Sequence, residues 1–424
     1  MGTSFVIHGG KPLQGEVIMS GSKNAAFPII AACLLTDEPC VLENVPTIQD
    51  VVVMLQMTEK LGVSIDWDRA AHRLSLHAKH LESHSPDETL SRKFRGSILF
   101  AGALLGRLGA ASIPYPGGDA IGARPLTAHL RAFEELGVKI TEDRLIEMDG
   151  GKLVGAAFPM QEPSATGTEN AILAAVLAPG KTIISLGDFA PPVQELIKFL
   201  RSMGADIAIQ DVVRIEINGV KKLHGTTYRI NPDEVEISSL AALAAATRSE
   251  VALQGVAPQY LDAVFLQLKA MGVAFEHSAD TLTIRKPVAG YKSFRIQSGL
   301  YPKLMPDHLP PFAALATQAE GVSLVHEWMY ENRLRYITEL QKMGATCEIL
   351  DPHRALITGP AVLAGCHVES FDLRAGMVLV IAALVARGKS VIANVEHIDR
   401  GYEALESRLQ AIGADIKRIS ENNK

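Results

Sequence analysis

Apolar and polar positions along the chain follow a pattern that occurs six times. Each copy has a helical stretch with one apolar face, an apolar residue followed by Gly, and then a short run typical of a strand. Glycine at this point is the expected left-handed cap, because it has no Cβ to clash at positive φ. The glycines recur at intervals of about 70 residues, and they are Gly62, Gly137, Gly204, Gly272, Gly344 and Gly413.

A second kind of helix recurs in the same six copies, rich in Ala and Leu and apolar on nearly all sides. A helix of this kind must be buried on most of its surface, so it belongs inside a domain with sheets packed around it. Six α/β units of this size predict two domains of three units each. The six apolar stretches are 24–35, 95–109, 169–180, 237–249, 309–321 and 374–388.

The boundary between the two domains is expected near Tyr228–Pro232, where the proline favours a non-helical connection. A second crossing near Ser20–Ser22 would let a strand over Phe5–Ile18 join the C-terminal domain. Two connections would form a hinge, with a ligand cleft between the lobes that closes on binding. The predicted C-terminal lobe is 1–22 plus 231–424, and the predicted N-terminal lobe is 23–230, carrying a mobile loop around 114–125.

Composition and charge exclude several classes of function. Lys and Arg number 41 against 47 Asp and Glu, a net charge of −6, which gives no overall reason to bind nucleic acid or an anionic membrane. The longest apolar run, Ala25–Leu35, is too short to cross a bilayer and is interrupted by Pro28. The four cysteines form no C-x-x-C pair, and the histidines show no metal-ligand spacing. These features predict a cytoplasmic protein without a disulfide framework or a metal site.

Charged residues recur at one structural point, the start of the apolar helices, where Lys23, Arg95, Asp307 and Arg374 lie. A Lys at a helix N-terminus favours anion binding, although it can also be merely exposed. The loop 116–125 brings glycines, an acid and a base together and is longer than a turn requires. Loops of this kind carry catalytic groups or serve only as connections, and the loop by itself does not decide between the two.

Five motifs in a fixed order carry a family resemblance: SGSKNAAFP, PYPGGDAIGARP, MGATC after YENR, FDLRAG and HIDRGYE. Together they resemble the bacterial UDP-N-acetylglucosamine 1-carboxyvinyltransferases, a family of enolpyruvyl transferases related to 3-phosphoshikimate 1-carboxyvinyltransferase. The resemblance covers essentially the whole chain. It implies an α/β fold, a two-lobed inside-out α/β barrel with three units per domain. The loop and the HIDRGYE segment match the nucleotide-sugar branch rather than the 3-phosphoshikimate branch.

The resemblance also implies an activity: transfer of the enolpyruvyl group of phosphoenolpyruvate to the 3-hydroxyl of UDP-N-acetylglucosamine, with release of phosphate and no cofactor. This is the first committed step of peptidoglycan precursor synthesis. The addition and elimination need a proton donor, a base and cations for the donor's charges. The implied catalytic residues are Asp119, Asp307 and Lys23. The implied phosphoenolpyruvate-binding residues are Lys23, Asn24, Arg124, Arg374 and Arg400. The implied acceptor-binding residues are Arg95, Arg124, Pro125, Leu126, Thr127, Ala128, Ser164, Asp307 and Met329.

One departure from the family pattern concerns the proton donor. Most members carry Cys in the mobile loop, whereas this chain has Asp119, an acid also found in some members. A carboxylic acid can donate the same proton where a dry site favours its protonated form. Without the thiol, the resemblance implies that fosfomycin does not inactivate the enzyme.

Other departures concern the acceptor. Glu162 stands where the family commonly has Lys near the diphosphate, Phe189–Pro192 replaces a charged stretch, and the segment around the base reads Met305–Leu309. Reversing a charge beside a diphosphate should weaken binding unless another cation replaces it. Two alternatives therefore stay open: a related transferase that uses a different uridine nucleotide or nucleotide sugar, and a catalytically silent binding protein.

Overall fold

The computed structural model describes residues 2–211 and 214–420, and their contacts divide them into two compact units. Unit 1 holds the described parts of Met1–Ser20, Asp119–Ala123 and Pro232–Lys424, and unit 2 holds Gly21–Gly118 and Arg124–Asn231. Each unit has its own continuous hydrophobic core. The tip of the loop between β6 (Ala110–Pro114) and α5 (Thr127–Glu135) is therefore grouped with unit 1, while both of its ends belong to unit 2.

Unit 1 contains three sheets. The first has the order β22 (His367–Glu369), β23 (Lys389–Ala393), β1 (Thr3–His8) and β24 (Asp415–Ser420). The second has the order β15 (Phe275–His277), β16 (Thr281–Ile284), β14 (Glu250–Gln254) and β2 (Gln14–Ile18). The third has the order β17 (Tyr291–Lys292), β19 (Ala319–His326), β21 (Arg354–Gly359) and β20 (Thr346–Asp351), and β18 (Arg295–Gln297) also pairs with β19.

The prediction of a single strand over Phe5–Ile18 is wrong, although the segment does belong to unit 1. The segment forms two strands, β1 and β2, which lie in different sheets of unit 1. Between them Gly10 has φ of 83°, in the left-handed region, and Pro12 has no N–H to donate to a ladder. These two residues end the first strand and redirect the chain to the second sheet.

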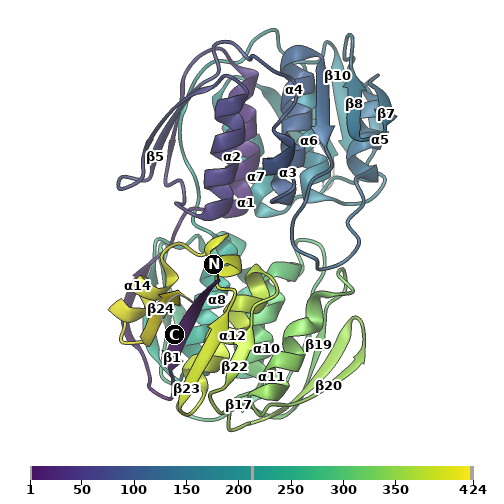
Figure 1. The fold of residues 1–424 in the computed structure, drawn as a ribbon. Helices are drawn as coiled ribbons and strands as arrows, with labels where there is room; N and C mark the ends of the chain where they lie inside the picture. The colour runs from purple at the N-terminus through teal and green to yellow at the C-terminus, as the bar shows by residue number, and fades with distance from the viewer. Residues whose placement is uncertain (1, 212–213, 421–424) are drawn as a thin grey trace. The chain divides into compact units, whose positions relative to one another are not determined.

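Three buried helices fill the interior of unit 1 and contact one another: α8 (Glu234–Ala246), α10 (Leu309–Ala316) and α12 (Leu373–Val385) (Figure 1). Every residue of α8 and α10 is buried, as expected for helices that are apolar over most of their surface, and the polar residues of α8 lie in its first two turns. The more amphipathic helices of this unit are α9 (Asp262–Met271), α11 (Tyr336–Lys342) and α14 (Leu405–Ala411). Short helical turns are η3 (Pro258–Tyr260), η4 (Pro306–His308), η5 (Arg333–Arg335) and α13 (Glu396–Asp399).

Unit 2 repeats this plan. Its first sheet has the order β11 (Asp206–Gln210), β12 (Arg214–Asn218), β10 (Lys181–Ser185) and β9 (Ala157–Pro159). The second has the order β13 (Thr227–Arg229), β3 (Cys40–Glu43), β5 (Arg73–His77) and β4 (Ser64–Asp68). The third has the order β6, β8 (Leu145–Asp149) and β7 (Lys139–Glu142). The buried helices α1 (Lys23–Ala32), α4 (Leu99–Leu108) and α6 (Ala165–Ala175) contact one another. The remaining helical elements are η1 (Cys33–Leu35), α2 (Gln49–Lys60), α3 (Glu88–Ser91), η2 (Arg95–Ile98), α5 and α7 (Pro191–Ser202).

The predicted fold class is confirmed. Each unit holds three sheets and three buried helices, so the chain contains six α/β units. The six repeat glycines all have positive φ, between 77° and 99°, as the cap at the end of each amphipathic helix requires. Over the described ranges, no helix is long and apolar enough to cross a membrane.

Candidate functional site

The starts of the buried helices hold most of the residues that the sequence singled out. A helix N-terminus leaves backbone N–H groups without intrahelical partners, so polar side chains gather there. In unit 1 the caps are carboxylates: Asp233 caps α8 and Asp372 caps α12, each accepting two backbone N–H groups. In unit 2 the caps are hydroxyls: Ser22 caps α1 and Ser164 caps α6, each accepting one.

Asp307 is the centre of an ionic cluster in unit 1. It lies in η4, immediately before α10. Arg374 of α12 donates from Nε and Nη2 to Oδ2 of Asp307, at 3.1 and 3.0 Å. Arg333 donates from Nη2 to Oδ1 at 2.5 Å. The two guanidiniums are 3% and 4% exposed and Asp307 is 31% exposed, so the carboxylate is held from behind and still reaches the surface.

Arg333 is a residue that the sequence reasoning missed. It lies in η5, before the amphipathic helix α11, and therefore not at the start of an apolar helix. Its Nε and Nη1 have no partner among the described residues, nor do Oε2 of Glu327 or the hydroxyl of Tyr336. Burial lowers the pKa of Arg333, but the charges of Asp307 and Glu327 outweigh burial and raise it overall. Arg333 is therefore a permanent cation beside Asp307.

Burial has different effects on two other groups of this cluster. Burial raises the pKa of Asp372, although the Arg333 charge and two backbone N–H bonds oppose the shift. Burial lowers the pKa of His308 to about 4, so this imidazole is neutral at pH 7. The Ser238 hydroxyl donates to Val235 O, which leaves Nδ1 of His308 as the donor in its 2.8 Å bond to Ser238.

Asp119 forms an ion pair with Arg400, the residue that follows α13. Both side chains are largely buried, 17% and 16% exposed. Two further bonds fix the tip of the loop within unit 1: Ala123 N donates to Glu331 Oε1 at 2.8 Å, and Asn332 N donates to Ile121 O at 3.0 Å. The predicted proton donor and a predicted phosphoenolpyruvate ligand are thus direct partners.

In unit 2, Lys23 is the first residue of α1, and Asn24 beside it is half-buried. Nζ of Lys23 lies 3.3 Å from Oδ2 of Asp50, and these side chains are 11% and 5% exposed. The ammonium also lies 5.8 Å from the centre of the Phe27 ring. Lys23 lies at the start of a helix, as the sequence predicted. Its burial decides against a merely exposed side chain, and its anionic partner Asp50 was not predicted.

The segment predicted to bind the acceptor is organised around a buried histidine of α5. Nδ2 of Asn170 donates to Nδ1 of His129 at 2.8 Å, which makes Nε2 the donor to Thr166 Oγ1 at 3.3 Å. Burial lowers the pKa of His129 to about 3, and the Arg95 charge adds to this effect. Asn170 also bonds Gly102 N and Ile98 O, so one neutral network joins α4, α5 and α6.

The other residues of the predicted acceptor set lie around this network or in unit 1. Arg95 Nη2 donates to Pro125 O at 3.1 Å. Ser164 is used as the cap of α6, and Glu162 before it is exposed. Met329 is half-buried, and its N–H donates to the buried carboxylate of Glu327. The remaining members are Arg124 and Leu126, which are half-buried, Pro125 and Thr127, which are exposed, and Ala128, which is buried.

The structure therefore brings together three pairs among the predicted residues: Asp307 with Arg374, Asp119 with Arg400, and Arg95 with Pro125. The residues missed by the sequence reasoning are Arg333, Asp50, His129 and Asn170. A buried amide or imidazole on an apolar helix, as at Asn170, is the signal that could have identified the unit 2 network. Across the part of the chain that the structure describes, no three His, Cys, Asp or Glu side chains are grouped to hold a metal ion.

Comparisons with known proteins extend over almost the whole chain. The sequence pattern of the EPSP synthase (3-phosphoshikimate 1-carboxyvinyltransferase) family matches residues 7–409. UDP-N-acetylglucosamine 1-carboxyvinyltransferases from Treponema denticola and Bradyrhizobium diazoefficiens are 42% and 40% identical, over 97% and 98% of this chain and 98% of each relative. The crystal structure of the enolpyruvyl transferase NikO from Streptomyces tendae superposes with a TM-score of 0.90 at 24% identity, covering 98% of this chain and 99% of that one. An EPSP synthase from Acinetobacter baumannii gives a TM-score of 0.79 at 19% identity, covering 99% and 100%.

Proposed function

Since the chain belongs to the EPSP synthase family and, within it, to the UDP-N-acetylglucosamine 1-carboxyvinyltransferases, we propose that it transfers the enolpyruvyl group of phosphoenolpyruvate to the 3-hydroxyl of UDP-N-acetylglucosamine and releases phosphate. The geometry that supports this proposal best is the Asp307 cluster. Two buried guanidiniums hold one carboxylate and leave it partly exposed. Such a carboxylate is fixed in direction and can accept a proton from a substrate hydroxyl.

In the proposed reaction Asp307 takes the proton of the acceptor hydroxyl, and the oxygen adds to C2 of phosphoenolpyruvate while C3 gains a proton. Loss of a proton from C3 and of phosphate from C2 then gives the enolpyruvyl ether. The donor carries a phosphate and a carboxylate, so it needs cations. Lys23, Arg124, Arg374 and Arg400 are proposed to bind it, with Asn24 as a neutral hydrogen-bonding neighbour and Lys23 also as a catalytic residue.

Asp119 is the proposed donor of the proton to C3. Its carboxyl group is paired with Arg400, a proposed ligand of the donor. A phosphate bound by Arg400 would compete with Asp119 for the same guanidinium. Binding of the donor would thereby release the Asp119 carboxyl group from this ion pair.

For the acceptor we propose Arg95, Arg124, Pro125, Leu126, Thr127, Ala128, Ser164, Asp307 and Met329 as binding residues. The neutral network around His129 supports this assignment, because it fixes the start of α5 relative to the cap of α6. We also propose two lobes, 1–22 plus 231–424 and 23–230, and an activity in the cytoplasm, in the first committed step of peptidoglycan precursor synthesis. Phosphoenolpyruvate and a UDP-sugar are the proposed partners, with no nucleic acid.

A phosphate-release assay tests the proposal against its alternatives. The full chain is supplied with phosphoenolpyruvate and, separately, with UDP-N-acetylglucosamine, other UDP-sugars, UMP or shikimate 3-phosphate. Release that is fastest with UDP-N-acetylglucosamine supports the proposal. Release only with another uridine nucleotide would favour the altered acceptor that Glu162 and Phe189–Pro192 suggest. No release with any acceptor would favour a binding protein and contradict the proposal.

Fosfomycin provides a second test, directed at Asp119. Because this loop position carries a carboxyl group in place of a thiol, prolonged incubation with fosfomycin should leave phosphate release unchanged. Asp119→Cys supplies the matched comparison and should make release sensitive to the compound. Time-dependent inactivation of the unsubstituted chain would contradict the role of Asp119.

A further inference from the structure

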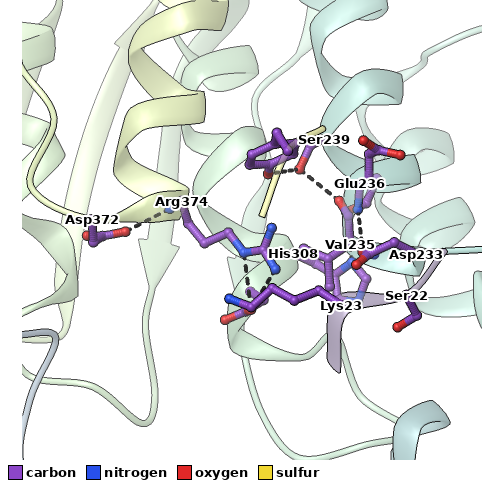
Figure 2. Close-up of polar contacts among 12 residues, drawn as sticks. Ser22, Lys23, Asp233, Val235, Glu236, Ser239, His308, Asp372 and Arg374 are labelled. Atoms are coloured by element: carbon purple, nitrogen blue, oxygen red, sulfur yellow. Dashed lines mark hydrogen bonds and ion pairs between the residues drawn. The ribbon is translucent and has the colours of Figure 1, made fainter. Parts of the chain in front are cut away.

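A chain of buried hydroxyl groups leads to Arg374 from the side opposite Asp307. Arg374 donates from Nε and Nη2 to Asp307, and its side chain is 3% exposed. Its guanidinium carbon lies 5.4 Å from the centre of the Tyr402 ring. The Tyr402 hydroxyl is bonded to Oγ of Ser239 at 2.8 Å, and Ser239 is bonded to Val235 O at 2.8 Å. Figure 2 shows this arrangement around Ser239, Val235 and Arg374.

The direction of these hydrogen bonds follows from proton counting. A carbonyl oxygen only accepts, so the single hydroxyl proton of Ser239 is donated to Val235 O. Ser239 Oγ must then accept from Tyr402, which donates its only hydroxyl proton to that bond. The Tyr402 oxygen is left with lone pairs only, and these face the positive charge of the Arg374 guanidinium, which contacts the Tyr402 side chain. The order of contact is Arg374, Tyr402, Ser239, Val235.

The electrostatics of the group agree with this order. Burial raises the pKa of Tyr402, although the charge of Arg374 and the bond to Ser239 lower it in part. The phenol is therefore neutral at pH 7 and keeps the proton that the order requires. Tyr402 is 1% exposed and Ser239 is fully buried, so water does not replace either hydroxyl freely. Buried hydrogen-bond chains of this kind fix the geometry of the group at their end.

We infer that Tyr402 and Ser239 are positioning residues for Arg374: Ser239 holds the Tyr402 hydroxyl, and Tyr402 contacts the guanidinium and fixes its plane, so that Arg374 binds Asp307 through Nε and Nη2 and directs the carboxylate toward the acceptor hydroxyl. The inference rests on the proposed function, in which Asp307 is the base. Neither residue touches the reacting atoms. Both act through Arg374.

The experiment compares two buried tyrosines that each have a hydroxyl hydrogen bond and a nearby arginine. Tyr291 is also 1% exposed, donates its hydroxyl to Ala245 O at 2.8 Å and has an arginine, Arg248, 6.0 Å from its ring centre. Tyr402→Phe and Tyr291→Phe each remove one buried tyrosine hydrogen bond and should lower the melting temperature to a similar extent. Only Tyr402→Phe should lower kcat, by about tenfold, the cost of about one hydrogen bond, with KM for the acceptor changed less than threefold.

A double variant tests whether the two hydroxyls act as one chain. Ser239→Ala should lower kcat about as much as Tyr402→Phe, and the double variant should be no slower than either single variant, because the chain is already broken. Independent structural roles would instead leave kcat unchanged and add their effects on stability. A Tyr402→Phe enzyme with the kcat of the unsubstituted chain would overturn the inference, as would multiplied losses of kcat in the double variant.

A second measurement does not depend on the activity: the Nε–H signal of Arg374 is followed by nitrogen-resolved NMR. The signal is assigned by its loss in Arg374→Lys. It should shift and exchange faster with solvent in Tyr402→Phe and stay unchanged in Tyr291→Phe. An unsubstituted chain that releases no phosphate would contradict the proposed function alone, whereas an unchanged Arg374 signal in Tyr402→Phe would contradict the positioning role.

Discussion

The two units place different chemistry at the same structural point. In unit 1 two of the buried helices are capped by carboxylates, Asp233 and Asp372, and Asp307 before the third contacts two buried arginines. In unit 2 two of the buried helices are capped by serines, Ser22 and Ser164, and a neutral network around His129 and Asn170 joins α4, α5 and α6, with the Lys23–Asp50 ion pair at the start of α1. The same architecture therefore carries an ionic cluster around Asp307 in one unit and a neutral hydrogen-bonded network around Asn170 in the other.

The difference has a physical reason. Buried ions are tolerated only when their geometry and partners are well satisfied, so an ionic cluster resists substitution and fixes the direction of each group. A neutral network costs less to bury and permits changes at its edge, such as the exposed Glu162 beside Ser164. Under the proposed function the base and the proton donor belong to unit 1, while unit 2 supplies Lys23 and most of the proposed acceptor-binding residues.

The largest expected effect comes from removing the charge of Asp307. Asp307→Asn keeps the size of the side chain but loses the base and the anion between Arg333 and Arg374. Phosphate release should fall by about 10³- to 10⁴-fold, in the upper range for loss of an acid or base. Asp262→Asn, an exposed acid at the start of α9, is the control and should keep normal rates. Comparable rates for the two variants would remove the basis for placing the chemistry in unit 1.

Acid should destabilise both units through their buried histidines. The pKa values of His308 in unit 1 and His129 in unit 2 are lowered by burial to about 4 and about 3. The folded state therefore binds fewer protons than the unfolded state, and the stability that is present above pH 6.5 is lost as pH falls below it. Each group can contribute up to about 1.4 kcal/mol per pH unit.

Thermal melts between pH 7 and pH 5 measure this effect. His308→Gln and His129→Gln should each make melting less dependent on pH in that window, because neither amide takes up a proton. The unsubstituted chain, melted over the same pH range, is the reference. A melting temperature of His129→Gln that falls with pH as steeply as that of the unsubstituted chain would show that the unit 2 network is not kept neutral by burial.

The smallest expected effect is the difference in stability lost when a carboxylate cap or a hydroxyl cap is removed. Asp233→Ala removes a buried carboxylate that accepts Val235 N at 2.9 Å and Glu236 N at 2.8 Å, and should destabilise by about 2 kcal/mol. Ser164→Ala removes one hydroxyl acceptor at 3.2 Å and should cost about 1 kcal/mol. Urea denaturation measures both. Equal midpoints for the two variants would show that the carboxylate caps are no stronger than the hydroxyl caps.

Much of the fold could be predicted from the sequence, because the repeat glycines and the all-apolar helices are local signals that mark each unit. The division of Phe5–Ile18 into β1 and β2 was not predicted, since sheet membership depends on distant partners such as β14 and β23. Within the site, Lys23, Asp307 and Arg374 were identified by their recurrence at helix starts. Arg333 and Asp50 were not, because their roles arise from contacts with residues far away in the sequence.

The product formed in heavy water tests the central claim most directly. The full chain is incubated in ²H₂O with phosphoenolpyruvate and UDP-N-acetylglucosamine, and the nucleotide sugar is examined by mass spectrometry and NMR. Addition followed by elimination passes through a methyl group at C3, so the account predicts an enolpyruvyl ether at the 3-hydroxyl with deuterium in its methylene group and one phosphate released for each ether formed. An unchanged nucleotide sugar, or an ether without deuterium, would contradict the account.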